Sequence, residues 1–223
     1  MIDIKSYEAV IFDMDGVLID SEPLWKIAME EVFHSVGCLI TKKDFQKTVG
    51  LRIDEVVLYW YENVGWENCS AQDVEDKIIQ RMIELIQQNG TPLIGVLDTI
   101  DFLRSKGIKI GLGTSSYNVL IEAVLTTLEI TEKFDFVHSA ENEEFGKPHP
   151  AVYITVAKRL EVHPSKCLVI EDSLNGIKSG QAAGMKVVCI PEKTHNPEPK
   201  LSRAEFMFED MSALLDAFKT KNK

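Results

Sequence analysis

The pattern of apolar and polar residues along the chain predicts alternating strands and helices over much of its length. Three short runs rich in β-branched residues stay apolar on both faces up to their carboxyl ends, which is typical of buried parallel strands. They are residues 9–13, 108–113 and 167–171, and weaker candidates are residues 134–139 and 185–190. Helical patterns occupy residues 96–106, 118–128, 150–160 and 174–183. This alternation predicts an α/β domain with a parallel sheet.

Residues 17–92 interrupt the alternation, because they contain no strand pattern. Ser21 can cap a helix that runs to about residue 36. Ser70 and Asp73 form a capping-box pattern at the start of a long amphipathic stretch. We therefore predict a helical subdomain, residues 17–92, inserted after the first strand of a core that consists of residues 1–16 and 93–223.

Composition narrows the choice of partners and compartment. The 223 residues include 35 acidic and 24 basic side chains, and the formal charge of −11 argues against nucleic acid or an anionic membrane as the main partner. No stretch approaches the roughly 18 apolar residues that span a bilayer, and the acidic N-terminus is unlike a signal peptide. The four cysteines lie far apart, which is typical of core residues in a reducing compartment. We expect a cytoplasmic monomer.

Two carboxylates, Asp13 and Asp15, lie at the carboxyl end of the first predicted strand, and Gly16 frees the turn that leaves it. In open α/β sheets, ligands bind outside the carboxyl ends of the strands. Two negative charges held close together raise the free energy of double ionisation, so that one carboxylate takes a proton or a cation binds. The position of this pair predicts a functional site.

The other predicted strands also end in polar residues. The second is followed by Thr114, Ser115 and Ser116, whose hydroxyls and backbone N–H groups can receive an anion. Taken singly, each polar residue can be interpreted as a helix cap or a solvated loop charge. Together, the carboxylates, hydroxyls and one lysine suit a phosphate held by a divalent cation. Lys147 comes after the third strand, and Glu171 and Asp172 lie where the fourth strand ends.

These segments resemble the four motifs of the haloacid dehalogenase superfamily, in the order and spacing of its phosphatase branch. The inserted helices resemble the cap of the group that contains β-phosphoglucomutase and small sugar-phosphate phosphatases. Residues 11–23 and 50–54 are similar to bacterial hexitol and 2-deoxyglucose-6-phosphate phosphatases. The resemblance covers nearly the whole chain and implies a Rossmann-like parallel-sheet core with a helical cap after the first strand. The motifs read Asp13-x-Asp15-Gly-Val, Thr114-Ser-Ser, Gly146-Lys147-Pro and Glu171-Asp172-Ser-x-x-Gly176.

The resemblance implies a role for each motif residue. Asp13 would be the nucleophile that takes the phosphoryl group as an aspartyl phosphate, and Asp15 would protonate the leaving sugar oxygen and then activate water. Mg²⁺ would bind the carboxylates of Asp13 and Asp172 and the backbone carbonyl of Asp15, and Glu171 would support these ligands from behind. The phosphoryl oxygens would be held by Thr114, the Ser115 N–H and Lys147.

A charge count predicts that one carboxyl group of the site is protonated. The four acidic residues of the motifs carry −4 when ionised, and Mg²⁺ with Lys147 returns +3. A phosphate dianion would thus meet a net negative site unless one carboxyl binds a proton. We expect Asp15 to carry it, because an acid must arrive protonated whereas a nucleophile and a metal ligand must not.

The inserted segment bears on the substrate and on the reaction type. Glu22 and Arg52 are the predicted substrate contacts, although Arg52 can equally be interpreted as a surface charge. Trp25 stands where the mutases of this group have a histidine, and Ile53 pairs with their phosphate-gripping arginine. Both departures favour Mg²⁺-dependent hydrolysis of a small sugar or hexitol phosphate. The alternative is phosphoryl transfer between sugar positions, as in β-phosphoglucomutase.

Two other classes of protein compete with this interpretation. The run from Gly111 through Gly113 to Ser116 imitates a dinucleotide fingerprint, and Asp135 lies about 20 residues further on, so an NAD-dependent oxidoreductase is one alternative. A serine replaces the third glycine, however, and the run follows the second strand rather than the first. A sugar-phosphate sensor is the non-enzymatic alternative, against which the complete set of catalytic residue types argues.

Overall fold

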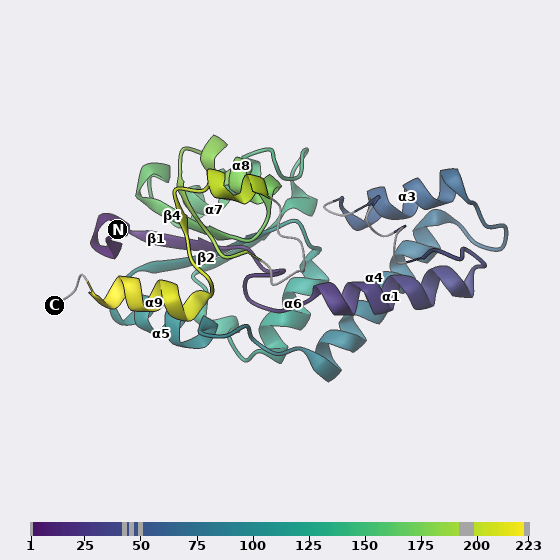
Figure 1. Ribbon diagram of the computed structural model, residues 1–223, viewed down its shortest axis with the longest axis horizontal. Coiled ribbons are helices and arrows are strands. Elements are labelled where there is room, and N and C mark those ends of the chain that lie inside the picture. Colours follow the sequence, from purple (N-terminus) through teal and green to yellow (C-terminus); the bar gives the residue numbers. More distant parts are fainter. Residues whose placement is uncertain (1, 42–43, 45–46, 49–50, 192–198, 221–223) are drawn as a thin grey trace. The chain divides into compact units, whose positions relative to one another are not determined.

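The computed structural model describes residues 2–220 apart from 42–43, 45–46, 49–50 and 192–198 (Figure 1). The chain forms two compact units. Unit 1 comprises Met1–Asp20 and Thr91–Lys223, and unit 2 comprises Ser21–Gly90. The predicted domain organisation, with a core of residues 1–16 and 93–223 and an inserted subdomain of residues 17–92, stays a prediction. Gly50, in the segment compared with the hexitol phosphatases, lies outside the described residues.

Unit 1 is built on a six-stranded sheet in the order β3-β2-β1-β4-β5-β6, in which every neighbouring pair is parallel. The predicted α/β fold with a parallel sheet is confirmed. The strand order runs in opposite directions from β1, and ligands bind at such a switch point in open α/β sheets. The strands are β1 (Ala9–Phe12), β2 (Lys109–Thr114), β3 (Phe136–Ser139), β4 (Cys167–Glu171), β5 (Lys186–Cys189) and β6 (Phe206–Met207).

Helices cover both faces of this sheet. In Figure 1, α7 and α8 lie on one face, and α5 and α9 lie on the other. Side chains of Ile11, Val169 and Val187 meet Val156 and Ile177 in the core beneath α7 and α8. These β-branched residues are buried because both faces of a parallel sheet are covered. The helices of unit 1 are α5 (Val96–Ser105), α6 (Asn118–Thr127), α7 (Ala151–Arg159), α8 (Leu174–Ala182) and α9 (Met211–Thr220).

The two glycines of β2 allow α7 to pack closely against the sheet. A Cβ atom on Gly111 would lie 2.5 Å from Val156 Cγ1, and one on Gly113 would lie 3.1 Å from the Tyr153 ring. A side chain would clash at Gly111 and would crowd the Tyr153 ring at Gly113. The glycine pattern that imitates a dinucleotide fingerprint has this structural explanation.

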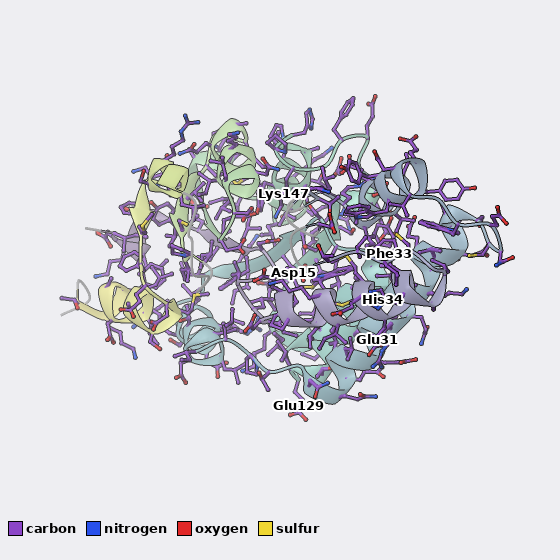
Figure 2. The ribbon with its side chains drawn as sticks, turned by 45° about the vertical axis from the view of Figure 1, so that its right-hand side comes forward. Asp15, Glu31, Phe33, His34, Glu129 and Lys147 are labelled. Carbon is purple, nitrogen blue, oxygen red and sulfur yellow. The ribbon has the colours of Figure 1, made fainter. Side chains whose placement is uncertain are left out.

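Unit 2 consists of helices around their own apolar core. Along α1 (Glu22–Ser35), Phe33 is fully buried, whereas the neighbouring Glu31 and His34 are exposed (Figure 2). α1 packs against α4 (Ala71–Asn89), as does α3 (Ile53–Asn63). None of the helices formed by the described residues combines the length and the apolar character that a bilayer crossing requires.

The two predicted helix starts in unit 2 have different outcomes. The capping box at α4 is confirmed, because the Ser70 hydroxyl accepts from the Asp73 N–H and the Asp73 carboxylate accepts from the Ser70 N–H. Ser21 does occupy the N-cap position of α1, but its side chain makes no capping hydrogen bond. Pro23 follows in the first turn, where a proline lacks only an N–H that the helix leaves unpaired.

Candidate active site

The carboxyl ends of β1 and β4 meet at the turn that leaves β1. Gly16 in this turn has φ +71°, a left-handed conformation that favours glycine. A Cβ atom at this position would lie 2.1 Å from Asp172 Oδ2. The glycine therefore allows the Asp172 carboxylate to approach the turn that carries Asp13 and Asp15.

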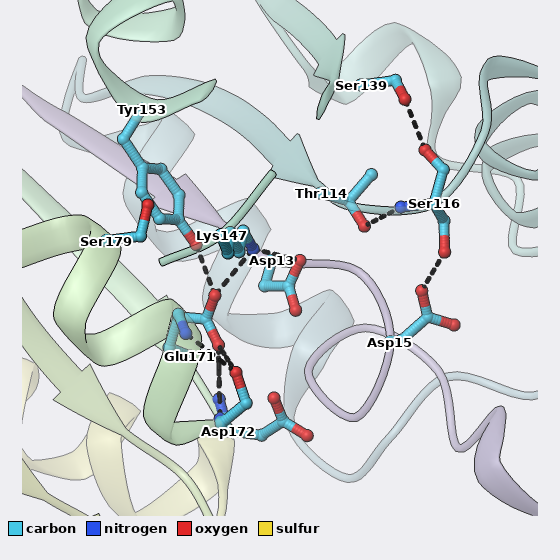
Figure 3. A network of polar contacts seen from close by, with 12 residues as sticks. Asp13, Asp15, Thr114, Ser116, Ser139, Lys147, Tyr153, Glu171, Asp172 and Ser179 are labelled. Atoms are coloured by element: carbon cyan, nitrogen blue, oxygen red, sulfur yellow. Dashed lines mark hydrogen bonds and ion pairs between the residues drawn. The ribbon is translucent and has the colours of Figure 1, made fainter. Parts of the chain in front are cut away.

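Lys147 is a buried cation held between two carboxylates. Its Nζ donates to Asp13 Oδ1 at 2.8 Å and to Glu171 Oε1 at 2.7 Å (Figure 3). Only 6% of the Lys147 side chain is exposed. We call Asp13, Lys147 and Glu171 the buried ion cluster. The interpretation of Lys147 as a solvated loop charge is wrong, because the loop between β3 and α7 directs this side chain into the protein.

The protonation of Lys147 is set by its two anionic neighbours. Burial alone would lower the pKa of this amine, since desolvation penalises the charged form. The negative charges and hydrogen bonds of Asp13 and Glu171 outweigh that effect and raise the pKa of Lys147. The lysine is therefore charged at neutral pH.

Glu171 is fully buried, and donors surround both of its oxygens. Oε1 accepts from Lys147 and, at 2.6 Å, from the Tyr153 hydroxyl. Oε2 accepts from the backbone N–H groups of residues 172 and 173 and from the Ser173 hydroxyl at 3.0 Å. A Cβ atom on Gly176 would lie 1.8 Å from this carboxylate, so the glycine of the fourth motif makes room for it.

The residue that caps α8 is not the one that the sequence suggested. Ser173, not Asp172, caps α8, because its hydroxyl accepts from the Gly176 N–H at 3.0 Å. The interpretation of Asp172 as a helix cap is therefore wrong. Its carboxylate instead lies beside the β1 turn.

Three carboxylates gather closely enough to hold a metal ion. Oxygens of Asp13, Glu171 and Asp172 all lie within 4.8 Å of one another. Burial raises the pKa of Asp13 from 3.8 to about 7, although Lys147 partly opposes this effect. With Lys147 as the neighbouring cation, ionised carboxylates would leave a net charge of −2. Hard oxygen donors with such an excess suit a divalent cation such as Mg²⁺.

The carboxyl end of β2 carries two hydroxyl groups, and one of them contacts Asp15. Ser116 donates from Oγ to Asp15 Oδ2 at 2.6 Å, and its N–H donates to the hydroxyl of the buried Thr114 at 3.1 Å. Ser115 lies between them, partly buried. Neither Thr114 nor Ser116 caps α6, because Tyr117 holds the N-cap position. The predicted residues of unit 1 thus come from four separate segments and lie at one edge of the sheet (Figure 3).

The two predicted substrate contacts belong to unit 2. Glu22 accepts a hydrogen bond from Lys26 on the next helical turn. The Arg52 guanidinium pairs with Asp54, and the Arg52 N–H donates to Glu55 Oε2 at 2.9 Å. The contact of Glu22 and Arg52 with substrate stays a prediction.

Sequence reasoning missed Tyr153, which contacts both Lys147 and Glu171. One signal could have indicated it: a hydroxyl-bearing residue lies on a face of α7 whose other members, Val152, Val156 and Ala157, are buried and apolar. A buried phenol needs a hydrogen-bond partner, and the nearest strand ends are acidic.

Comparisons with known proteins agree with this geometry. The family model described as haloacid dehalogenase-like hydrolase matches residues 10–190. Hexitol phosphatase B of Escherichia coli (strain K12) is 37% identical over 207 residues, 92% of this chain and 93% of that protein. A phosphorylated carbohydrates phosphatase of Thermotoga maritima is 34% identical over 184 residues, 80% of this chain and 82% of that protein.

A solved structure has the same fold. The β-phosphoglucomutase of Clostridium difficile superposes with a TM-score of 0.79 at 26% identity, over 96% of this chain and 98% of that chain. The oxidoreductase and sensor alternatives are wrong, and the prediction of a phosphoric monoester hydrolase is confirmed. The chain belongs to the haloacid dehalogenase-like hydrolase family, in its phosphoglucomutase-like group.

Proposed function

We propose that this protein is a Mg²⁺-dependent phosphatase that hydrolyses the monophosphate of a small sugar or hexitol through an aspartyl phosphate on Asp13. The observation that carries this proposal is the buried ion cluster, in which Lys147 orients one oxygen of Asp13 at the edge of the sheet. Among the described residues, no donor contacts the other oxygen, which suits a nucleophile. The names of the two phosphatase relatives support the substrate class.

The metal would be held by the carboxylates of Asp13 and Asp172 and by the backbone carbonyl of Asp15. Glu171 belongs to the same acidic group, but five donors already contact its oxygens. Its role is therefore to fix Lys147 and the turn after β4. When bound, the cation supplies positive charge that offsets the carboxylates and lets a phosphate dianion approach.

The first chemical step transfers the phosphoryl group to the protein. An Asp13 carboxylate oxygen forms a bond to phosphorus while the bond between phosphorus and the sugar oxygen breaks, and Asp15 donates its proton to that oxygen. Such proton transfer contributes roughly 10²- to 10⁴-fold to the rate. Lys147, the Thr114 hydroxyl and the Ser115 N–H hold the other phosphoryl oxygens as their charge redistributes.

The second step restores the protein. Asp15, now a carboxylate, takes a proton from water, and the resulting nucleophile attacks the phosphorus of the aspartyl phosphate. The bond between phosphorus and Asp13 breaks, inorganic phosphate leaves, and Asp15 is again protonated. The Ser116 hydroxyl, 2.6 Å from Asp15, orients this carboxyl group.

The proton on Asp15 is tested by the pH dependence of kcat/KM. We expect kcat/KM of the wild type to fall on the alkaline side, and we expect Asp15→Asn to lack that limb. An alkaline limb unchanged by the substitution would remove this assignment and point to another acid.

The reaction type and substrate are tested by one screen. Phosphate release is measured with Mg²⁺ over hexose, hexitol and pentose phosphates, and isomerisation of glucose 1-phosphate is assayed alongside. The likeness to a β-phosphoglucomutase makes the mutase the second candidate. We expect phosphate release from hexitol or hexose phosphates, and isomerisation without phosphate release would establish the mutase instead.

The same screen addresses Glu22 and Arg52, which we propose as substrate contacts. Arg52→Ala is expected to raise KM for the sugar phosphate and to leave the hydrolysis of an aryl phosphate unchanged. Equal effects on both substrates would remove Arg52 from the specificity-determining residues.

A further inference from the structure

Tyr153 has no task in the mechanism above, although it lies against the buried ion cluster. It projects from α7, is fully buried and donates its hydroxyl to Glu171 Oε1 at 2.6 Å. Its ring lies 4.8 Å from Lys147 Nζ. Tyr153 therefore contacts both members of the Lys147–Glu171 ion pair (Figure 3).

Packing alone does not require the hydroxyl of this tyrosine. A phenylalanine would fill nearly the same volume under β2, where Gly113 has no side chain and makes room for the ring. A phenol buried without a partner would be costly, and here the partner is a carboxylate that also accepts from Lys147. The hydroxyl is thus directed specifically at the ion cluster.

Lys147 needs such support because its side chain is long and its ammonium is compact. Four rotatable bonds must be fixed before the amine can hold a phosphoryl oxygen reproducibly. Two of the three ammonium N–H groups donate to Asp13 and Glu171. The third can reach a phosphoryl oxygen only while both carboxylates keep their orientation.

We propose that Tyr153 is a positioning residue that fixes Lys147 against Asp13, through its hydrogen bond to Glu171 and through the ring that lies beneath the ammonium. The inference rests on the proposed function, because it assigns Lys147 to the phosphoryl group. The hydroxyl is one of the donors that hold the Glu171 oxygen shared with Lys147, and the ring face attracts the cation electrostatically. Tyr153 acts through Lys147 and does not touch the substrate.

The test is Tyr153→Phe, assayed for hydrolysis of p-nitrophenyl phosphate with Mg²⁺. This variant keeps the ring and removes only the hydroxyl. We expect kcat to fall about 10-fold, the order expected for one hydrogen bond to a charged group, and KM to change less than kcat. Tyr7→Phe is the matched control, since Tyr7 is also buried but precedes the amino end of β1, away from the strand ends that carry the site. The kcat of this variant should match that of the wild type.

A double-mutant cycle separates positioning from a purely structural role. In a Lys147→Met background, the added Tyr153→Phe substitution should leave the residual kcat unchanged, because the residue it positions is absent. An unchanged kcat in the single variant, or the same fold-loss in both backgrounds, would overturn the proposal. A wild type that hydrolyses no phosphate monoester would instead overturn the proposed function.

A second variant covers the case in which Tyr153→Phe does not fold. Gly113→Ala places a methyl group 3.1 Å from the Tyr153 ring and keeps the hydroxyl. The ring must shift by a few tenths of an ångström, so we expect a smaller loss of kcat that also disappears in the Lys147→Met background. Full activity of a folded Gly113→Ala variant would count against the proposal.

Discussion

Charged side chains are used in opposite ways in the two units. In unit 1, the Lys147 side chain is 6% exposed and the Glu171 side chain is not exposed at all. They form a buried ion pair at the carboxyl ends of the strands. In unit 2, Arg81 pairs with Glu31 between two helices, and these side chains are 28% and 51% exposed. The residue types are comparable, but the surroundings differ.

The difference shows which ion pair is not explained by stability alone. Burying an ion pair requires desolvation that its mutual attraction often does not repay, and well-packed apolar residues are frequently as stable. Exposed pairs lose little water and contribute little. The buried ion cluster is thus best explained by chemistry, whereas the Arg81–Glu31 pair is explained by a solvated helix surface.

The largest effect is expected from Asp13→Asn. Without the proposed nucleophile, turnover should fall by at least about 10⁴-fold, as for other covalent catalysts. Phosphate release by purified protein measures it. Asp76→Asn, an exposed residue of α4 that accepts a hydrogen bond from Gln72, is the matched control and should keep full activity. Comparable activity of the two variants would mean that Asp13 is not the nucleophile.

Stability measurements test whether burial is what distinguishes Lys147 from Arg81. Lys147→Met leaves Asp13 and Glu171 without their cation, and the loss of one partner of a buried pair lowers the free energy of unfolding by about 3–5 kcal/mol. Arg81→Met should show no measurable change by denaturant titration. If both variants unfolded at the same denaturant concentration as the wild type, burial would not be the relevant difference.

Metal binding is expected to offset part of the repulsion in the acidic group. Mg²⁺ at about 100 times its dissociation constant should raise the free energy of unfolding by about 2.7 kcal/mol. In Asp172→Asn this gain should largely disappear, because one proposed ligand becomes neutral. Thermal unfolding with Mg²⁺ or with a chelator measures the gain, and Asp210→Asn is a control outside the acidic group. A full gain in Asp172→Asn would exclude Asp172 as a ligand.

A smaller effect is expected at Glu143, whose environment is intermediate between the buried ion cluster and the exposed Arg81–Glu31 pair. It accepts from Thr155 Oγ1 at 2.6 Å and pairs with His138 Nε2 at 2.7 Å. Partial burial opposes its ionisation, but these hydrogen bonds prevail and lower the pKa of Glu143. Its stabilisation is therefore complete above the ordinary glutamate pKa of 4.5 and is lost as the pH falls through the lower folded value.

This dependence is measured by comparing the unfolding of wild type and Glu143→Gln between neutral and acidic pH. The difference between them should be about 1 kcal/mol or less at neutral pH and should vanish in acid. A difference that stays constant with pH would show that packing, not the carboxylate charge, explains the role of Glu143.

Much of the fold could be predicted from local pattern. The strand predicted at residues 167–171 coincides with β4. A short run that is apolar on both faces is typical of a strand inside a parallel sheet covered by helices. The two-residue strand β6 was missed, since two residues carry no period. Helix α9, which packs on α5, was also missed.

The sequence indicated several residues of the candidate site but not the contacts that they make. Carboxylates, hydroxyls and a lysine after four strands indicated Asp13, Lys147 and Asp172. The pattern did not indicate that Ser173 would cap α8, or that Tyr153 would reach Glu171 from another helix. Such contacts depend on the crossing of α7 over the sheet, which follows from packing rather than from neighbouring residues.

Local periodicity and turn chemistry are enough to predict the alternation of strands and helices, the break in that alternation, and the polar residues at the strand ends. The folded structure is needed to know which charges are buried, which oxygens already have donors, and why Gly16 and Gly176 must be glycine. Burial and close approach are properties of segments distant in the chain. They arise when parallel strands bring their carboxyl ends to the same edge of one sheet.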